Sequence, residues 1–177
     1  MDEGEARLTT SPVSVVSLGV ESTTRRTLLV AGLATLVVPI GLAQDKPRPP
    51  ALADELVREF VGAGHGNLEK VKSMLAEHPG LLNATWDWGG GDWESAIGGA
   101  GHMGRADIAG YLIEQGARVD IFVAAMLGQL DVVKGMIAAM PAQAKAKGPH
   151  GISLRRHAEK GGEAAKPVLA YLESLPG

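Results

Sequence analysis

Apolar residues recur at helical spacing in several segments of the chain, and three of these segments share one layout. Each begins with a glycine, has an acidic residue three positions later, and continues with apolar residues that would form one face of a helix. These segments are 66–75, 104–113 and 128–137, and a looser copy at 167–172 has Pro167 in place of the acid. The pattern predicts four amphipathic helices.

The residues around each glycine predict a second, shorter helix before it. Glycine commonly ends a helix in the left-handed conformation, and an acid or a proline is favourable in the first turn of the helix that follows. Short runs of small and apolar residues precede the four segments, at 53–61, 95–101, 122–127 and 154–159. We therefore predict an all-α fold of about four helix–turn–helix units, with structural turn residues at Gly66, Gly104 and Gly128.

One stretch of the chain resembles a known repeat. The run from Ala100 to Asp120 has small residues, a glycine, an acid, an apolar helix and then Gly-Ala-x-Val-Asp, which is similar to the ankyrin repeat. In place of the family's opening Thr-Pro-Leu-His the chain has Glu-Ser-Ala-Ile at 94–97, and the third unit lacks this segment. The resemblance implies an ankyrin-repeat solenoid over residues 52–177. It also implies that His65 and His102, beside the turns, hydrogen-bond to loop backbone.

The spacing of the turn glycines shows where this chain departs from a regular repeat. They lie 38 and then 24 residues apart (66 to 104, then 104 to 128), whereas the ankyrin period is about 33 residues. The resemblance makes the connections β-hairpin fingers. We thus expect one enlarged finger at 82–93, a second shortened to Asp120-Ile121, and a third at 141–151 that carries Lys145, Lys147 and His150.

The enlarged finger holds all three tryptophans of the chain around three consecutive glycines. Tryptophan is the residue most enriched at interaction hot spots, so the finger is a candidate binding surface. We expect four residues to contact a partner: Trp86, Asp87, Trp88 and Asp92. Trp93, nearest the next helix, is expected to pack inward, because Gly98 and Gly99 leave a bare helix face that accepts an indole ring.

Ankyrin domains are overwhelmingly protein-binding modules, so the resemblance implies a non-enzymatic scaffold that binds an unidentified protein through the finger and the concave helix face. The alternative is a small-molecule-binding protein or a hydrolase-like enzyme that uses Asp87, Asp92, Glu94 and His102. No motif spacing supports that cluster, so no catalytic residue, metal ligand or cofactor is expected. A basic patch formed by Lys145, Lys147, His150, Arg155 and Arg156 could meet an acidic partner or anionic lipid.

The first 43 residues resemble a bacterial twin-arginine export signal. Arg25-Arg26 precede an uncharged span of 18 residues, Thr27 to Gln44, which is too short and too interrupted by proline and glycine for a typical membrane helix. We expect cleavage after Ala43, a proline-rich linker at 44–51, and a periplasmic or secreted product. An uncleaved anchor in the inner membrane is the alternative.

Composition narrows the remaining function classes. The net charge is −3 and no cysteine is present, which argues against nucleic-acid binding and excludes disulfides, thiol catalysis and cysteine-bound metal. Aromatic residues make up only 4% of the chain, and alanine and glycine are abundant, as suits closely packed helices of small residues. We expect a monomer.

Overall fold

The computed structural model describes residues 49–176, so the predicted signal and most of the predicted linker lie outside the described residues. The described part is mostly α-helical, which confirms the all-α prediction in its coarse form, and it contains one small two-stranded sheet. None of the helices in this part has the length and apolar character needed to cross a membrane.

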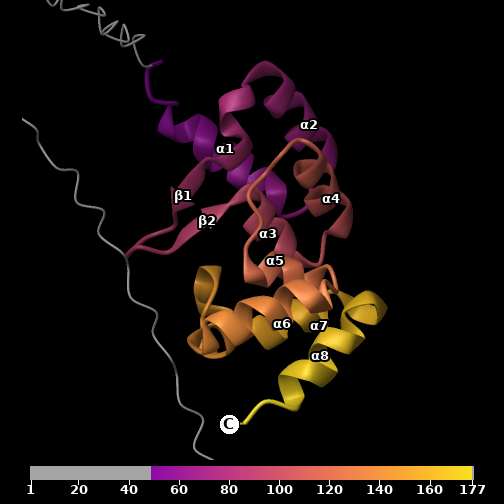
Figure 1. Cartoon of the computed structure of the whole chain (residues 1–177). Helices are drawn as coiled ribbons and strands as arrows, with labels where there is room; N and C mark the ends of the chain where they lie inside the picture. The colour runs from indigo at the N-terminus through magenta and orange to yellow at the C-terminus, as the bar shows by residue number, and fades with distance from the viewer. Residues whose placement is uncertain (1–48, 177) are drawn as a thin grey trace, which may run out of the picture. The chain divides into compact units, whose positions relative to one another are not determined.

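The helices follow one another as pairs along the chain (Figure 1). The first helices of the pairs are α1 (Asp54–Gly64), α3 (Ala96–Met103), α5 (Ile121–Met126) and α7 (Leu154–Lys160). Their partners are α2 (Leu68–Glu77), α4 (Ala106–Glu114), α6 (Leu130–Ala139) and α8 (Lys166–Glu173). Each helix packs against its partner, and α1, α3, α5 and α7 pack against one another in that order.

Local sequence signals explain where these helices begin. Side chains of Asn67, Ser95, Asp120 and Ser153 accept hydrogen bonds from the first turns of α2, α3, α5 and α7. The predicted acids lie in the first turns of α2, α4 and α6, and a proline opens α8. The helix starts therefore follow the sequence pattern closely.

The predicted turn glycines behave differently from one another. Gly104 and Gly128 follow their helices with φ of 74° and 72°, the left-handed conformation that was expected. Gly66 does lie in the turn between α1 and α2, but it is not left-handed, because the chain leaves α1 through His65 in a right-handed conformation; the expected left-handed geometry is therefore wrong at this position. Its carbonyl instead accepts a hydrogen bond from the Arg105 side chain, which links the first two helix pairs.

The enlarged finger forms an antiparallel hairpin of β1 (Thr85–Asp87) and β2 (Trp93–Ser95), in which Trp86 pairs with Glu94. The glycines at the tip, 89–91, all have positive φ (128°, 67° and 88°), which side chains with a Cβ rarely adopt. The Asp87 carboxylate closes this tip by accepting hydrogen bonds from the backbone N–H groups of Gly89 and Gly91. Three glycines are thus what the turn geometry requires.

Short 3₁₀ segments complete the connections: η1 (Pro79–Asn83), η2 (Pro141–Lys145) and η3 (Pro149–Gly151). A further one, η4 (Gly162–Ala165), leads into α8.

The core is two apolar clusters that meet at α5, which contributes Val123 and Met126 to one and Ile121 and Phe122 to the other. Close backbone approach holds the first helices together. A Cβ on Gly64 would overlap the carbonyl of Ala96, and one on Gly161 would overlap that of Met126.

Candidate metal centre

Four side chains from separate segments converge beside the hairpin. They are His65 after α1, Glu94 in β2, His102 in α3 and His150 in η3. One ligand atom from each lies within 4.8 Å of the ligand atoms of all the others. Imidazole nitrogens and a carboxylate oxygen are the ligands that divalent transition metals prefer, so the donor set suits such an ion.

His65 is positioned by the end of α1 and by a glycine of α3. Its Nδ1 lies 3.2 Å from the carbonyl oxygen of Val61, one turn earlier in α1. Its ring covers Gly99, where a Cβ would stand 2.9 Å from the imidazole. The bare helix face therefore accepts an imidazole ring, and the expectation that it accepts an indole is wrong.

Glu94 is the buried centre of the cluster. Side chains alternate between the two faces of a strand, so Glu94 points inward while its neighbours Trp93 and Ser95 point to the other face. The Glu94 side chain has no exposed area, and its Oε2 accepts a 2.7 Å hydrogen bond from the Trp88 indole N–H. Burial by itself would raise the pKa of Glu94, but hydrogen bonds to His102 and His65 lower it to about 2.

His102 completes a compact triangle with Glu94 and His65. Its Nε2 lies 2.9 Å from Glu94 Oε1 and 3.2 Å from His65 Nε2, and His65 Nε2 lies 3.3 Å from Glu94 Oε2. The hydrogen bond to Glu94 raises the pKa of His65 above its ordinary value, against the lowering effect of burial. Two imidazoles and one carboxylate are therefore in mutual contact between α1, β2 and α3.

His150 reaches the cluster from the third finger. Its Nε2 lies 3.5 Å from Glu94 Oε2, while its Nδ1 and its backbone N–H each lie 2.8 Å from a carboxylate oxygen of Asp92. His150 also has a φ of 59°, a strained conformation for a residue with a side chain. Hydrogen bonding to His150 is the main cause that lowers the pKa of Asp92.

The hydrogen bonds at the outer nitrogens determine what the inner nitrogens can do. A backbone carbonyl only accepts, so the Nδ1 of His65 carries a hydrogen, and the Asp92 carboxylate likewise selects the Nδ1–H form of His150. In the neutral rings of His65 and His150, each Nε2 then presents a lone pair toward Glu94, whereas a protonated ring donates its Nε2–H to that carboxylate, as in the hydrogen bond that raises the pKa of His65. Lone pairs and a carboxylate repel unless protons or a cation lie between them.

The spacing of these atoms matches a metal coordination sphere. Metal–nitrogen bonds of about 2.0–2.1 Å in a tetrahedron place neighbouring ligand atoms about 3.3 Å apart. The four short contacts in the cluster span 2.9 to 3.5 Å. The outer partners of the ligands, namely Val61, Asp92 and Trp88, are of the kind that orient metal ligands in proteins.

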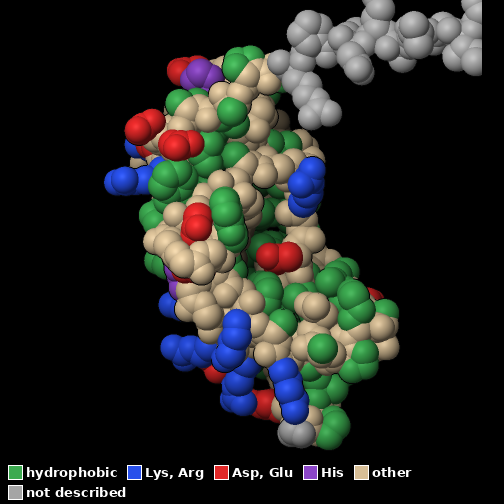
Figure 2. Space-filling model, turned by 90° about the vertical axis from the view of Figure 1, so that its left-hand side faces the viewer, with side chains coloured by type: hydrophobic (Ala, Val, Ile, Leu, Met, Phe, Trp, Pro, Cys, Tyr) green, Lys and Arg blue, Asp and Glu red, His purple; other side chains and the backbone are tan. Residues whose placement is uncertain are grey.

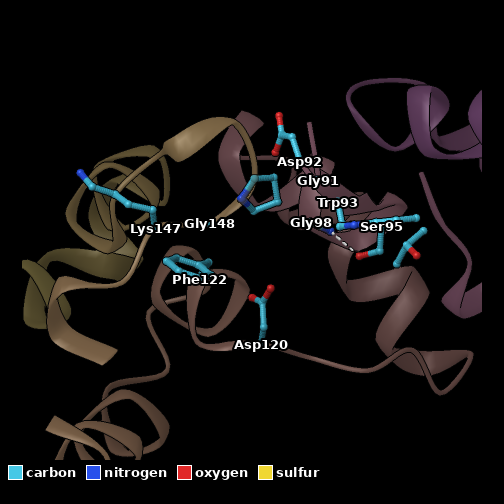
Figure 3. A pocket seen from close by; sticks show the side chains of 11 residues that line it. Gly91, Asp92, Trp93, Ser95, Gly98, Asp120, Phe122, Lys147 and Gly148 are labelled. Carbon is cyan, nitrogen blue, oxygen red and sulfur yellow. Dashed lines mark hydrogen bonds between the residues drawn. The ribbon is translucent and has the colours of Figure 1, made fainter. Parts of the chain in front are cut away.

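A cavity of about 370 Å³ lies beside this cluster, between the hairpin and the third finger (Figure 3). Gly91, Asp92, Trp93 and Ser95 form one wall, and Lys147 and Gly148 form the opposite one, with Asp120 and Phe122 of the α5 region at its floor; Pro149 also lines the cavity. Asp92 and Pro149 are thus shared between the cavity wall and the support of His150. The cavity and the cluster are neighbours built from the same two loops.

Some of the finger residues that were expected to contact a partner make contacts within the protein instead. Asp87 closes the glycine turn and Asp92 holds His150, while the Trp88 ring lies 6.2 Å from the rings of both His65 and His150. Trp86 is half-buried. Trp93 was expected to pack inward, but it is 60% exposed, more than Trp88 at 40%, because it alternates with the inward-facing Glu94.

The two histidines that were assigned to the turns also have a different role. His102 bonds to Glu94 and His65 rather than to loop backbone, and His65 bonds to its own helix. Of the expected cluster, Glu94, His102 and Asp92 do converge, whereas Asp87 does not take part. His65 and His150 were missed as members, because they lie 29 residues before and 56 residues after Glu94 (65, 94 and 150) with no recurrent spacing.

Basic side chains gather low on the face seen in Figure 2, toward the C-terminal helices. The predicted patch is partly neutralised there, since Arg155 and Arg156 pair with Glu159, and Arg155 also pairs with Glu173. His157 lies fully buried behind Phe122, and burial lowers the pKa of its imidazole.

Comparisons with protein-family models, with curated proteins and with solved structures found no match to this chain.

Proposed function

We propose that this protein binds one divalent transition-metal ion through His65, Glu94, His102 and His150. The observation that carries the proposal is the convergence of three imidazole Nε2 atoms on one buried carboxylate, with all four ligand atoms within 4.8 Å of one another. An ion at this point would compensate the buried charge of Glu94 and separate the facing lone pairs.

The donor set favours a class of ions. Imidazole is a ligand for zinc, copper, iron, cobalt and nickel, whereas calcium and magnesium prefer sites made of oxygen atoms. With three nitrogen donors and one oxygen donor, the site fits the first group. When bound, such an ion supplies a Lewis acid, which is the chemistry that the hydrolase alternative would need.

The proposal is tested by titrating the metal-free full chain with Co²⁺, whose visible absorption reports its coordination, and by competing the Co²⁺ with Zn²⁺. We expect one ion per chain. Glu94→Gln and His102→Ala remove a ligand each and should weaken binding at least 100-fold, since both side chains are buried in the cluster. Metal also changes the environment of Trp88, so its fluorescence gives a second readout.

The matched control is His78→Ala, because His78 is an exposed histidine that lies outside the cluster. This variant should bind Co²⁺ as the unchanged chain does. Unchanged metal binding in a variant that carries both Glu94→Gln and His102→Ala would contradict the proposal. Failure of the unchanged chain to bind Co²⁺ or Zn²⁺ would also contradict it.

We further propose that the helix pairs are ankyrin-type repeats of an exported, monomeric protein. The order of packing of α1, α3, α5 and α7, the left-handed Gly104 and Gly128, and the acids in the first turns support this assignment. The arginine pair and the uncharged span before residue 45 support export to the periplasm or beyond, with anchoring in the inner membrane as the alternative.

A second candidate function is the binding of a protein partner through the finger. The favouring observation is Trp93, an indole that is 60% exposed at the rim of the cavity beside Phe122. Large exposed aromatic side chains at the edge of a cavity are typical of interaction hot spots. This role is compatible with metal binding, because Trp93 and Glu94 lie on opposite faces of β2.

Trp93→Ala should therefore reduce capture of partner proteins from a periplasmic extract by tenfold or more, with no change in the melting temperature. The matched control is Val132→Ala, which removes an apolar side chain of similar exposure (45%) from α6. Equal capture by the two variants would count against a binding role for the finger.

A further inference from the structure

The four residues of the cluster are not equivalent, and the difference separates His150 from the rest. His102 Nε2 lies 3.2 Å from His65 Nε2 and 2.9 Å from Glu94 Oε1, while His65 Nε2 lies 3.3 Å from the other carboxylate oxygen, Glu94 Oε2. Octahedral coordination with bonds of about 2.1 Å places adjacent ligands about 3.0 Å apart. These contacts thus suit two histidines and one carboxylate that hold an ion from the same side.

His150 stands further from these three residues. Its ring centroid lies 5.2 Å from that of His102 and 6.4 Å from that of His65, compared with 4.9 Å between His65 and His102. Its side chain is the most exposed of the four at 34%, compared with 27% for His65, 9% for His102 and 0% for Glu94. His150 therefore approaches the cluster from the solvent side.

The supports of His150 are also weaker than those of Glu94 and His102. Glu94 and His102 belong to a strand and a buried helix, while His150 lies in a short turn with a φ of 59°. Both of its hydrogen bonds to the hairpin go to one half-exposed carboxylate, that of Asp92. The backbone strain at His150 is held in place by these contacts, so loss of the Asp92 contacts would favour its departure.

The side of the cluster that His150 covers is open to solvent, since the His150 side chain is 34% exposed. The cavity of about 370 Å³ lies on the other face of the hairpin, where Trp93 and Ser95 line it, and shares only Asp92 and the residues that directly precede His150 with this region. The Trp88 ring borders the same solvent side of the cluster. Movement of His150 away from Glu94 would therefore expose the ion to solvent on this side.

We propose that His150 is a displaceable ligand, and that a small anionic nitrogen- or oxygen-donor from solution binds the ion at the position that His150 vacates. This inference rests on the proposed metal site. His65, Glu94 and His102 hold the ion throughout, and Asp92 determines how readily His150 leaves. The site is thereby a ligand-binding centre rather than a closed structural one, which requires four fixed ligands.

The test uses the Co²⁺-loaded full chain with azide as the anionic probe and imidazole as a replacement for the His150 side chain. The unchanged protein should bind azide with a shift of its visible absorption. His150→Ala should retain Co²⁺ with at most a 100-fold loss of affinity, and added imidazole should restore the original spectrum. His102→Ala should lose Co²⁺ altogether.

Asp92→Asn tests the same inference without removing a ligand. Because the carboxylate holds His150 in place, the asparagine variant should bind azide about tenfold more tightly. An unchanged azide midpoint in Asp92→Asn, no azide response in the unchanged protein, or a loss of Co²⁺ in His150→Ala as complete as in His102→Ala would overturn the inference while leaving the metal site intact. Failure of the unchanged protein to bind Co²⁺ would instead remove the proposed function, and this inference with it.

Discussion

Saturation with Zn²⁺ should raise the melting temperature of the metal-free protein by about 10 °C. A ligand at 100 times its dissociation constant stabilises the folded state by about 2.7 kcal/mol, and 1 kcal/mol corresponds to about 4 °C for a domain of this size. The physical reason is that one ion would join the end of α1, β2, α3 and the third finger, which the unfolded chain cannot bring together.

Calorimetry or circular dichroism during heating gives this measurement, with and without Zn²⁺. Mg²⁺ provides the matched control ion, since it prefers oxygen ligands and should leave the melting temperature unchanged. Glu94→Gln should respond to neither ion. A Zn²⁺ response of equal size in Glu94→Gln would place the bound ion elsewhere on the chain.

In the metal-free protein, acid should remove a large part of the stability through Glu94. The pKa of Glu94 is about 2 in the folded state against 4.5 as its reference value. A carboxyl group with a lowered folded-state pKa contributes stability above its unfolded pKa and loses it as the pH falls through its folded pKa. The free energy of unfolding should therefore fall between pH 4.5 and pH 2, by about 3 kcal/mol from this group.

Urea unfolding at a series of pH values, in the presence of a chelator, measures the effect. Glu94→Gln isolates the contribution of this carboxyl, because the other acids with lowered pKa values, including Asp107 and Glu159, remain in the variant. The difference in stability between the two proteins should shrink as the pH falls. Parallel stability curves would show that Glu94 carries no such coupling to the histidines.

The amphipathic helices were predictable because their information is local. A glycine, an acid in the first turn and apolar residues at helical spacing each act within a few residues, and α2, α4 and α6 begin where this pattern places them. The hairpin was predicted from the resemblance, which makes the connections β-hairpin fingers, and the spacing between turns placed the enlarged one. The left-handed conformation of Gly66 was predicted wrongly because its neighbours allow the chain to leave α1 through a right-handed turn, which the sequence pattern does not distinguish.

The faces of the hairpin were harder to assign. Trp93 and Glu94 are adjacent, and hydrophobicity alone favours burial of the tryptophan over the acid. The structure reverses this order because Glu94 has hydrogen-bond partners in Trp88 and His102, contributed by the hairpin itself and by α3. A buried charge depends on such partners, and their presence is a property of the packed chain.

By itself, the sequence determined the helical class, the starts of the helices and a glycine-tipped hairpin that carries the tryptophans, because each depends on neighbours along the chain. It also placed Glu94 and His102, two residues of the proposed metal site, in a possible acid and histidine cluster, although no motif spacing supported that cluster. Only the tertiary structure decided that His65 and His150 join them. The packing of α1 against α3 at Gly64 and Gly99, and the contact of the third finger with Asp92, bring these residues together across 85 positions (65 to 150), a distance over which no local pattern acts.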